Sequence, residues 1–124
     1  MKFRFFLGVI GLLLMQAAQA NEVSGKQWKA MIITHFPPAF CEDDSYFRQC
    51  LKLSSNVCQK AALSATKTCL TTLKERIPTT FTSKEQATEV GTMLGKCVGL
   101  SLDLKFAHQK SADSQCADAS NWEQ

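Results

Sequence analysis

The amino-acid sequence predicts an all-α fold: a small helical domain built on an antiparallel helix hairpin and stapled by about three disulfides. Three observations lead to this prediction. Apolar residues recur at helical spacing in several segments, and a serine that can cap a helix precedes each segment. No stretch alternates polar and apolar residues convincingly as a strand would. Six cysteines lie in a chain of 124 residues, which is dense for so small a protein.

The N-terminus has the pattern of an export signal. Lys2 and Arg4 precede a short apolar run over 5–15, and Ala18-Gln19-Ala20 follows as a small-x-small pattern. This arrangement is typical of a secretory signal peptide that is cleaved after Ala20. The alternative is a retained membrane anchor, but that needs about 18 or more apolar residues, and this run is shorter. We therefore expect an exported protein, periplasmic or secreted.

Cleavage defines the expected domain organisation and lowers the charge. Residues 1–20 form the signal peptide, and 21–124 form a single disulfide-stapled helical domain with a polar C-terminal tail. Two of the 14 Lys and Arg residues leave with the signal, so 12 remain against 11 Asp and Glu, and the net charge falls from +3 to +1. Nucleic-acid binding normally requires a strongly basic face, so no nucleic-acid partner is expected. No second stretch is long and apolar enough to span a membrane.

The first helix is expected to begin at a capping box and to end at a proline pair. Ser24 and Gln27 have the spacing in which each side chain can bond the backbone N–H of the other residue. Apolar residues follow at helical spacing until Pro37-Pro38, which lack the N–H donors of a helix interior. We expect this helix to stop there.

Three further helices are expected. A short one over 46–51 follows a cap at Asp44 or Ser45, and a long one runs from Ser54 or Ser55 to about residue 76. The longest, 84–110, starts at a second capping box. A loop of about six residues joins the long helices into an antiparallel hairpin. The expected inner face of the last helix consists of Val90, Met93, Leu94, Cys97, Leu100, Leu104 and Ala107.

The six cysteines predict disulfides rather than a metal site, and no cofactor. They are Cys41, Cys50, Cys58, Cys69, Cys97 and Cys116, and the closest are eight residues apart, unlike the close pairs of zinc sites. Cys58 and Cys69 lie on one helix, separated by about 16 Å of rise, so they cannot pair. Counting outward from the hairpin loop favours Cys58–Cys97. The remaining pairs, Cys41–Cys69 and Cys50–Cys116, are proposed because they would tie the first segment and the C-terminal tail to the hairpin, and no spacing argument supports them.

No catalytic constellation stands out. His35 and His108 are the only imidazoles, and neither lies in a metalloprotease pattern. The C-x-x-C motif of redox proteins is absent, and a hydrolase would need a base that cannot be placed. The acidic run 42–44 is explained by helix capping. We therefore expect a protein that is not an enzyme.

One candidate binding feature is a basic stripe. Lys60, Lys67 and Lys74 recur every seven residues and would share one face of a helix. A solvated outer face is the ordinary explanation. The functional alternative is a weak, salt-sensitive contact with anionic lipid or an acidic protein surface.

A second candidate is a glycine face. Gly91, Gly95 and Gly99 recur every fourth residue of the last helix, and each costs about 1 kcal/mol relative to alanine. This spacing permits close approach of another backbone, either within the monomer or in a homodimer or a complex with a protein partner.

Aromatic residues near the first helix form a third candidate contact region. They are Trp28, Phe36 and Phe40.

Two resemblances add to this interpretation. The Cys58-x10-Cys69 spacing is similar to part of a saposin, but the paired cysteines at the saposin ends are missing, so no lipid activity is carried over. The runs Phe40-Cys41, Tyr46–Cys50 and Gly95–Gly99, with Cys116 and Trp122, resemble a loose group of small exported cysteine-containing helical proteins of Gram-negative bacteria. That group implies fold and compartment but no activity.

The preferred functional hypothesis is an exported non-enzymatic binding protein that acts through a rigid helical surface. The alternative is a secreted effector that binds anionic lipid or host surfaces through the basic stripe. Exported bacterial proteins of this size include substrates of type II secretion, an analogy that rests on size and signal.

Overall fold

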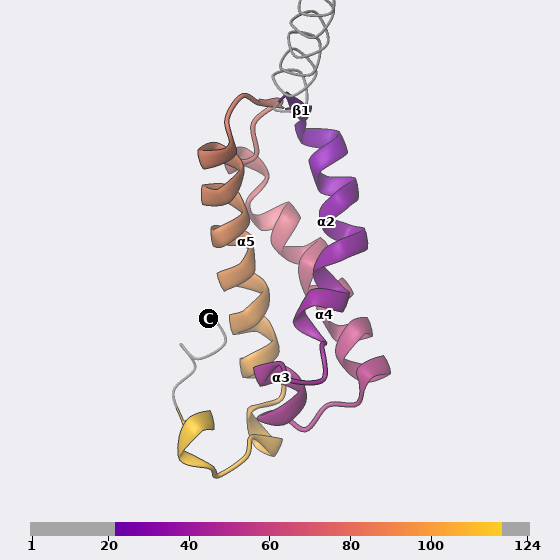
Figure 1. The fold of residues 1–124 in the computed structure, drawn as a ribbon, viewed down its shortest axis with the longest axis vertical. Helices are drawn as coiled ribbons and strands as arrows, with labels where there is room; N and C mark the ends of the chain where they lie inside the picture. The colour runs from indigo at the N-terminus through magenta and orange to yellow at the C-terminus, as the bar shows by residue number, and fades with distance from the viewer. Residues whose placement is uncertain (1–21, 118–124) are drawn as a thin grey trace, which may run out of the picture.

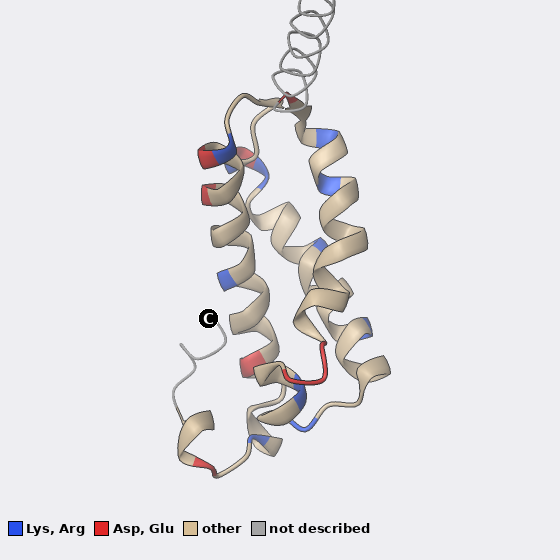
Figure 2. Cartoon of the chain, in the orientation of Figure 1, with Lys and Arg blue, Asp and Glu red and all other residues tan. Residues whose placement is uncertain are grey.

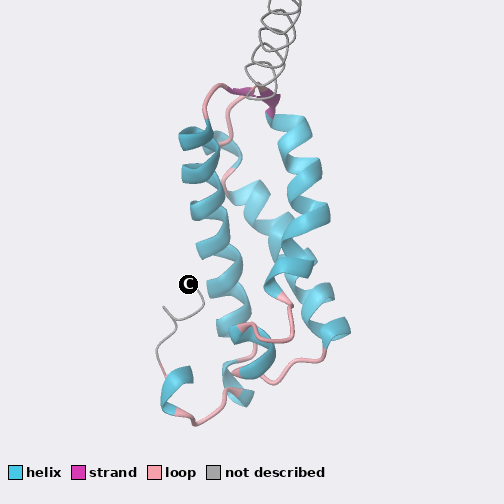
Figure 3. Ribbon diagram, in the orientation of Figure 1, coloured by secondary structure: helices cyan, strands magenta, loops and turns pink. Residues whose placement is uncertain are grey.

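A computed structural model describes residues 22–117 of the chain, so the expected signal peptide and Trp122 lie outside the described residues. Its secondary structure is almost entirely helical (Figure 3). The elements are β1 (Val23–Ser24), α2 (Gly25–Phe40), α3 (Tyr46–Gln49), α4 (Ser55–Thr72), the 3₁₀ turn η1 (Lys74–Arg76), β2 (Thr80–Phe81), α5 (Lys84–Lys105), and the 3₁₀ turns η2 (Ala107–Gln109) and η3 (Ser114–Cys116). The all-α prediction is confirmed.

Three helices, α2, α4 and α5, make up the body of the molecule (Figure 1). Helix α4 packs against both of the others, and α2 and α4 form the most extensive contact. At one end, β1 and β2 pair as a two-residue antiparallel ribbon with Val23 opposite Phe81. At the other end lie α3 and the C-terminal turns. No pattern in the amino-acid sequence predicts the ribbon, because two residues are too few to show alternation.

The predicted helix starts are confirmed by serine caps. Ser24, Ser45, Ser54 and Ser83 each have extended backbone and accept a hydrogen bond from the N–H three residues on. At Ser24 the capping box is complete, since the Gln27 side chain also accepts from the Ser24 N–H. The caps satisfy N–H groups that have no partner inside the helix.

The proline pair does not end α2, contrary to the sequence prediction. The helix continues through Pro37 and Pro38 to Phe40, and the Cys41 N–H donates to the Pro38 carbonyl at 3.1 Å. Packing holds this last turn in place: the Phe40 ring lies 5.2 Å from that of Phe47. Tertiary contacts therefore offset the backbone hydrogen bonds that the prolines remove.

The connection between the long helices is longer than predicted. Helix α4 ends at Thr72, and residues 73–83 contain η1 and β2 before α5 begins. This connector passes close to the start of α2, where the Gly25 N–H donates to the Thr79 carbonyl at 2.8 Å. A Cβ at Gly25 would overlap the Pro78 carbonyl oxygen. Glycine at this position allows the ribbon end to close.

The buried face of α5 agrees with the predicted one in its first half, where Val90 and Leu94 are buried, and differs from it further along the helix. Val90, Leu94, Val98 and Leu102 are buried at four-residue intervals, whereas the predicted Leu100 and Leu104 are 53% and 69% exposed. Four-residue spacing forms the ridge that helices use when they cross at an angle. The predicted face mixes steps of three and four residues, so its later members fall outside this ridge. Helix α5 also ends at Lys105, so the predicted inner residue Ala107 lies beyond it.

Three disulfides form, and two of the three predicted pairs are wrong. The pairs are Cys41–Cys58, Cys50–Cys116 and Cys69–Cys97, with Cα–Cα distances of 5.7, 5.4 and 6.0 Å. Cys50–Cys116 was predicted, whereas Cys58–Cys97 and Cys41–Cys69 do not form. No cysteine is left free.

The connector explains the wrong pairs. Counting from a tight loop assumed equal rise on both sides, but an extended segment rises about 3.3 Å per residue and a helix only 1.5 Å. Residues 73–83 therefore carry the chain well beyond the end of α4, and α5 returns past it with Cys97 level with Cys69. Because α2 continues through its prolines, Cys41 reaches Cys58 at the start of α4.

We predict that the cost of removing a bridge follows the length of chain that it closes. In the chain-entropy relation, the 66-residue separation of Cys50–Cys116 contributes about 4 kcal/mol and the 17-residue separation of Cys41–Cys58 about 3 kcal/mol. Urea unfolding of the two paired alanine variants should show this order. A larger loss for the shorter bridge would contradict the entropic account, and non-reducing peptide mapping tests the pairing itself.

Candidate interaction surface

The predicted aromatic contact region is part of the core. Trp28 is only 6% exposed, and its ring lies 5.1 Å from that of Phe81. Phe36 and Phe40 are half-buried and pack against each other with centroids 5.7 Å apart. These side chains hold α2 in place, and Trp28 is unavailable to a partner.

The charges of α2 and α4 are all positive. The two helices contain four lysines, Lys26, Lys29, Lys60 and Lys67, and no Asp or Glu. Their ribbons carry blue and no red in Figure 2. Helix α5, in contrast, balances three lysines with three carboxylates. Positive and negative charges are therefore unevenly distributed among the helices, although the net charge of the chain is small.

The predicted lysine stripe is only partly formed. Lys60 and Lys67 share a face of α4, but Lys74 lies in η1 beyond the end of the helix at Thr72. Lys26 and Lys29 of α2, which were not part of the predicted stripe, add two further positive charges beside Lys60 and Lys67. A signal for them was present in the sequence, because no acidic residue occurs between Glu22 and Glu42.

A shallow groove of about 250 Å³ lies between α2 and α4. It is lined by Ile33, Thr34, Pro37, Pro38, Gln59, Lys60 and Leu63. We call it the α2–α4 groove.

Lys60 lines this groove, and helical spacing places the other three lysines beside it. Ile33 comes seven residues after Lys26 and four after Lys29, so both lysines lie on the groove side of α2. Lys67 comes seven residues after Lys60, which lines the groove directly. The groove and these four lysines together form the α2–α4 face.

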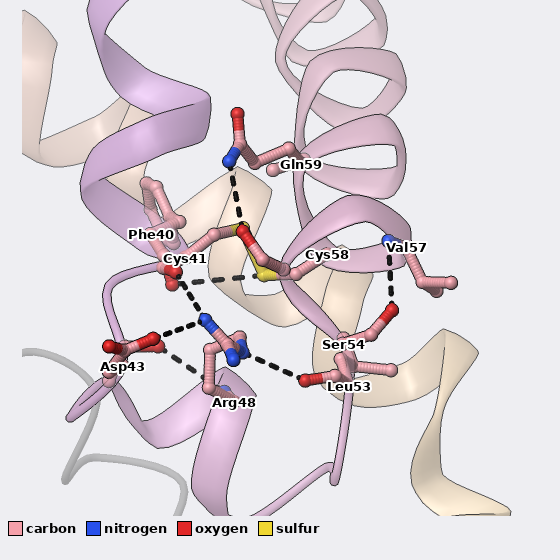
Figure 4. The surroundings of a disulfide bond; sticks show 12 residues. Phe40, Cys41, Asp43, Arg48, Leu53, Ser54, Val57, Cys58 and Gln59 are labelled. Carbon is pink, nitrogen blue, oxygen red and sulfur yellow. Dashed lines mark hydrogen bonds and ion pairs between the residues drawn. A yellow bond between two sulfur atoms is a disulfide. The ribbon is translucent and has the colours of Figure 1, made fainter.

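The end of this face is fixed by Arg48 (Figure 4). Its Nε donates to the Leu53 carbonyl at 2.9 Å, and one terminal nitrogen donates to the Cys41 carbonyl at 3.2 Å and to Asp43 at 2.9 Å. The Asp43 side chain is 96% exposed, so this ion pair contributes little to stability. The two carbonyl contacts tie the loops around the Cys41–Cys58 bridge together.

The glycine face is open over two of its three positions. A Cβ at Gly91 or Gly95 would meet nothing within 4 Å, whereas Gly99 is buried. Close packing within the described part of the molecule therefore does not explain Gly91 and Gly95. Nothing in the described structure shows a homodimer or a protein partner on this face.

A polar cluster fastens the C-terminal segment to α5. The Tyr46 hydroxyl donates to Asp103 Oδ1 at 2.8 Å, and Lys110 Nζ lies 3.0 Å from the same carboxylate. Burial raises the pKa of Tyr46 above its ordinary value of 10.0. Hydrogen bonds to Tyr46 and then to Asp103 raise the pKa of Lys110. The cluster lies beside the Cys50–Cys116 bridge, since the Cys116 carbonyl is 3.4 Å from the Tyr46 hydroxyl.

The described residues contain no group of three or more His, Cys, Asp or Glu side chains that could hold a metal ion. His35 and His108 are exposed and lie in different elements, α2 and η2. Within the same residues, no helix combines the length and apolar character that crossing a membrane requires.

Comparison with known proteins identifies a family. A family model described as "T2SS substrate NttA" matches residues 22–110. The chain belongs to this family. T2SS denotes the type II secretion system, so membership implies export and secretion. This family is consistent with the resemblance to small exported cysteine-containing proteins. No curated protein and no solved structure matches the chain. The matched region includes all of α2, α4 and α5, and ends before Cys116.

We predict that replacing glycine by alanine raises the free energy of unfolding at Gly91 and Gly95 of α5 and lowers it at Gly25, beside the ribbon. Gly91→Ala and Gly95→Ala should each stabilise the fold by about 0.5–1 kcal/mol, because the space is open and alanine favours the helix. Gly25→Ala should destabilise it by about 1–3 kcal/mol through overlap with Pro78. Chemical denaturation measures all three. Destabilisation by Gly91→Ala would show that the open face is covered.

We predict that Tyr46 titrates above its ordinary pKa. It is the only tyrosine in the chain, so phenolate absorbance measures this one group, and unfolding in denaturant should return its pKa to about 10. Asp103→Asn should lower the folded-state value. A folded-state pKa at or below the unfolded one would contradict the geometry of the cluster.

The same shifts predict loss of stability at high pH. Both Tyr46 and Lys110 have folded-state pKa values raised above the unfolded ones, so their contribution is fully present below the unfolded pKa values. It disappears as pH rises through the folded ones, because the folded state holds the protons longer. The free energy of unfolding should therefore fall above about pH 10. Tyr46→Phe should flatten this fall, measured by urea unfolding across that range.

Proposed function

We propose that this protein is a secreted, non-enzymatic binding protein that uses the α2–α4 face to contact an anionic partner outside the cell. Family membership supports delivery through type II secretion. The observation that carries the proposal is the separation of charge: four lysines and no carboxylate on the two helices that pack most extensively. A face of one sign attracts its partner from a distance and excludes like-charged surfaces.

The rigidity of the face supports a role in binding. The Cys41–Cys58 bridge joins the end of α2 to the start of α4, and Arg48 ties the neighbouring loops. The lysines are therefore presented from helices whose positions are fixed, which lowers the ordering cost of association.

The remaining polar features do not suggest chemistry at a site. Tyr46, Asp103 and Lys110 satisfy one another, and both shifted pKa values rise rather than move toward neutrality. A general base or an activated nucleophile needs a pKa near the working pH. The cluster is better explained as the fastening of the C-terminal segment, which is why we propose a binding protein and not an enzyme.

The test compares matched charge removals on two faces. Lys26, Lys60 and Lys67 are replaced by glutamine in one variant, and Lys84, Lys96 and Lys105 on α5 in the other, so both lose three charges. Binding to immobilised poly-glutamate and to phosphatidylserine vesicles is measured at low and high salt. At about 1 kcal/mol per lysine near an anionic surface, the first variant should lose on the order of 100-fold in affinity at low salt. The α5 variant should change much less.

Lys29 is left in place because it is half-buried, and its stem contributes to packing. Absence of wild-type binding to both anions at low salt would refute the proposal, as would equal losses in the two variants.

A further inference from the structure

The α2–α4 groove contains backbone acceptors that the helix cannot satisfy. In an α-helix, the carbonyls of Ile33 and Thr34 would accept from the N–H groups of residues 37 and 38, and both are proline. Thr34 cannot use the i+3 position either, because that residue is Pro37. The helix therefore presents the Thr34 carbonyl without an α-helical or 3₁₀ donor.

Neighbouring side chains do not supply the missing donor. The Gln59 amide, which lines the same groove, donates to Ser55 Oγ at 3.1 Å. The Thr34 hydroxyl donates back to the Ala30 carbonyl at 3.1 Å. Lys60 forms no ion pair or hydrogen bond with any residue that the structure describes. Thr34 and Pro38 both line the groove and are exposed residues, so this part of the helix surface faces the groove and solvent.

The groove therefore combines three kinds of recognition. It has a backbone acceptor at Thr34, a free cation at Lys60, and apolar walls from Ile33, Pro37 and Leu63. Its volume is below the roughly 300–1,000 Å³ of small-molecule pockets, and it is open along the helices. These properties suit a short length of chain laid across the surface.

We propose that the α2–α4 groove docks an extended acidic peptide segment. One peptide N–H donates to the Thr34 carbonyl, an apolar side chain rests on Ile33, Pro37 and Leu63, and a carboxylate pairs with Lys60. The inference rests on the proposed function, because it assumes that the α2–α4 face is the contact surface, and it names the class of partner.

A peptide fits these observations better than a lipid headgroup does. Phosphate and carboxylate oxygens accept hydrogen bonds and cannot donate to a free carbonyl. The ammonium group of phosphatidylserine can donate, but the lysines of the α2–α4 face repel it. An extended peptide offers both an N–H and a carboxylate, and its side chains alternate between the groove and solvent. Charge complementarity makes the segment acidic, because α2 and α4 carry no Asp or Glu.

The test uses the mature, oxidised protein and a fluorescein-labelled peptide of alternating glutamate and leucine. Two matched probes replace glutamate by lysine, or N-methylate the backbone, which removes donors without changing charge. Wild-type protein should bind the acidic peptide most tightly. N-methylation should weaken binding by about three- to tenfold, the range expected for one net hydrogen bond.

Variants test the same contacts from the protein side. Pro38→Ala restores an N–H that can bond the Thr34 carbonyl, so it should raise the melting temperature and weaken peptide binding by a similar factor. Lys60→Gln should also weaken binding, and Lys96→Gln on α5 should not. The N-methylated peptide keeps the test valid if a variant folds poorly.

The outcomes separate this proposal from the proposed function. If Lys60→Gln weakens binding but neither Pro38→Ala nor N-methylation does, the groove proposal is overturned, and the charged face stands. Binding to phosphatidylserine vesicles without binding to the acidic peptide overturns it in favour of a membrane. If neither peptide, poly-glutamate nor vesicles bind at low salt, the proposed function fails as well.

Discussion

The junction of α2 and α4 at the Cys41–Cys58 bridge is the constraint on which the rest of the structure depends. It holds the last turn of α2 beside the first turn of α4. Two consecutive prolines would ordinarily disfavour helix there. The bridge, the Phe40–Phe47 contact and the Arg48 hydrogen bonds all act within this turn. The helical path of Pro37 and Pro38, and hence the groove beside them, follows from that junction.

The starts of the helices could be predicted from the sequence because they depend on hydrogen bonds between residues that are close together in the chain. Serine caps place helix N-termini through hydrogen bonds between residues three apart, and one of the predicted residues caps each of the four helices. The second predicted capping box is not complete, because the Gln86 side chain accepts from the Thr82 N–H instead. Six cysteines in a small exported chain implied three bridges, and three form. Helix ends were less predictable. Whether a helix continues through Pro37 depends on contacts outside that helix, such as Phe40 with Phe47 and Cys41 with Cys58.

The pairing of cysteines and the buried face of α5 could not be obtained from the sequence because both depend on how elements cross. An extended connector changes the axial position of every residue after it, which shifted the partner of Cys97 from Cys58 to Cys69. Val98 and Leu102 are buried in place of the predicted Leu100 and Leu104, because the way in which α5 crosses its neighbours decides which of its residues face them. The candidate site shares this limitation. Lys60 and Lys67 were identified from their spacing, but Lys26 and Lys29 join them only because α2 packs on α4.

The three disulfides also explain how a small domain can maintain the α2–α4 face. Four lysines of one sign repel one another, and an acceptor without a helical donor and a proline pair weaken the helix that carries them. A domain of this size has little core energy to offset such features. Bridges that restrict the unfolded chain stabilise the fold without using surface residues. The exposed residues of α2 and α4 are then not required for stability, so binding to a partner can determine which residues occur there.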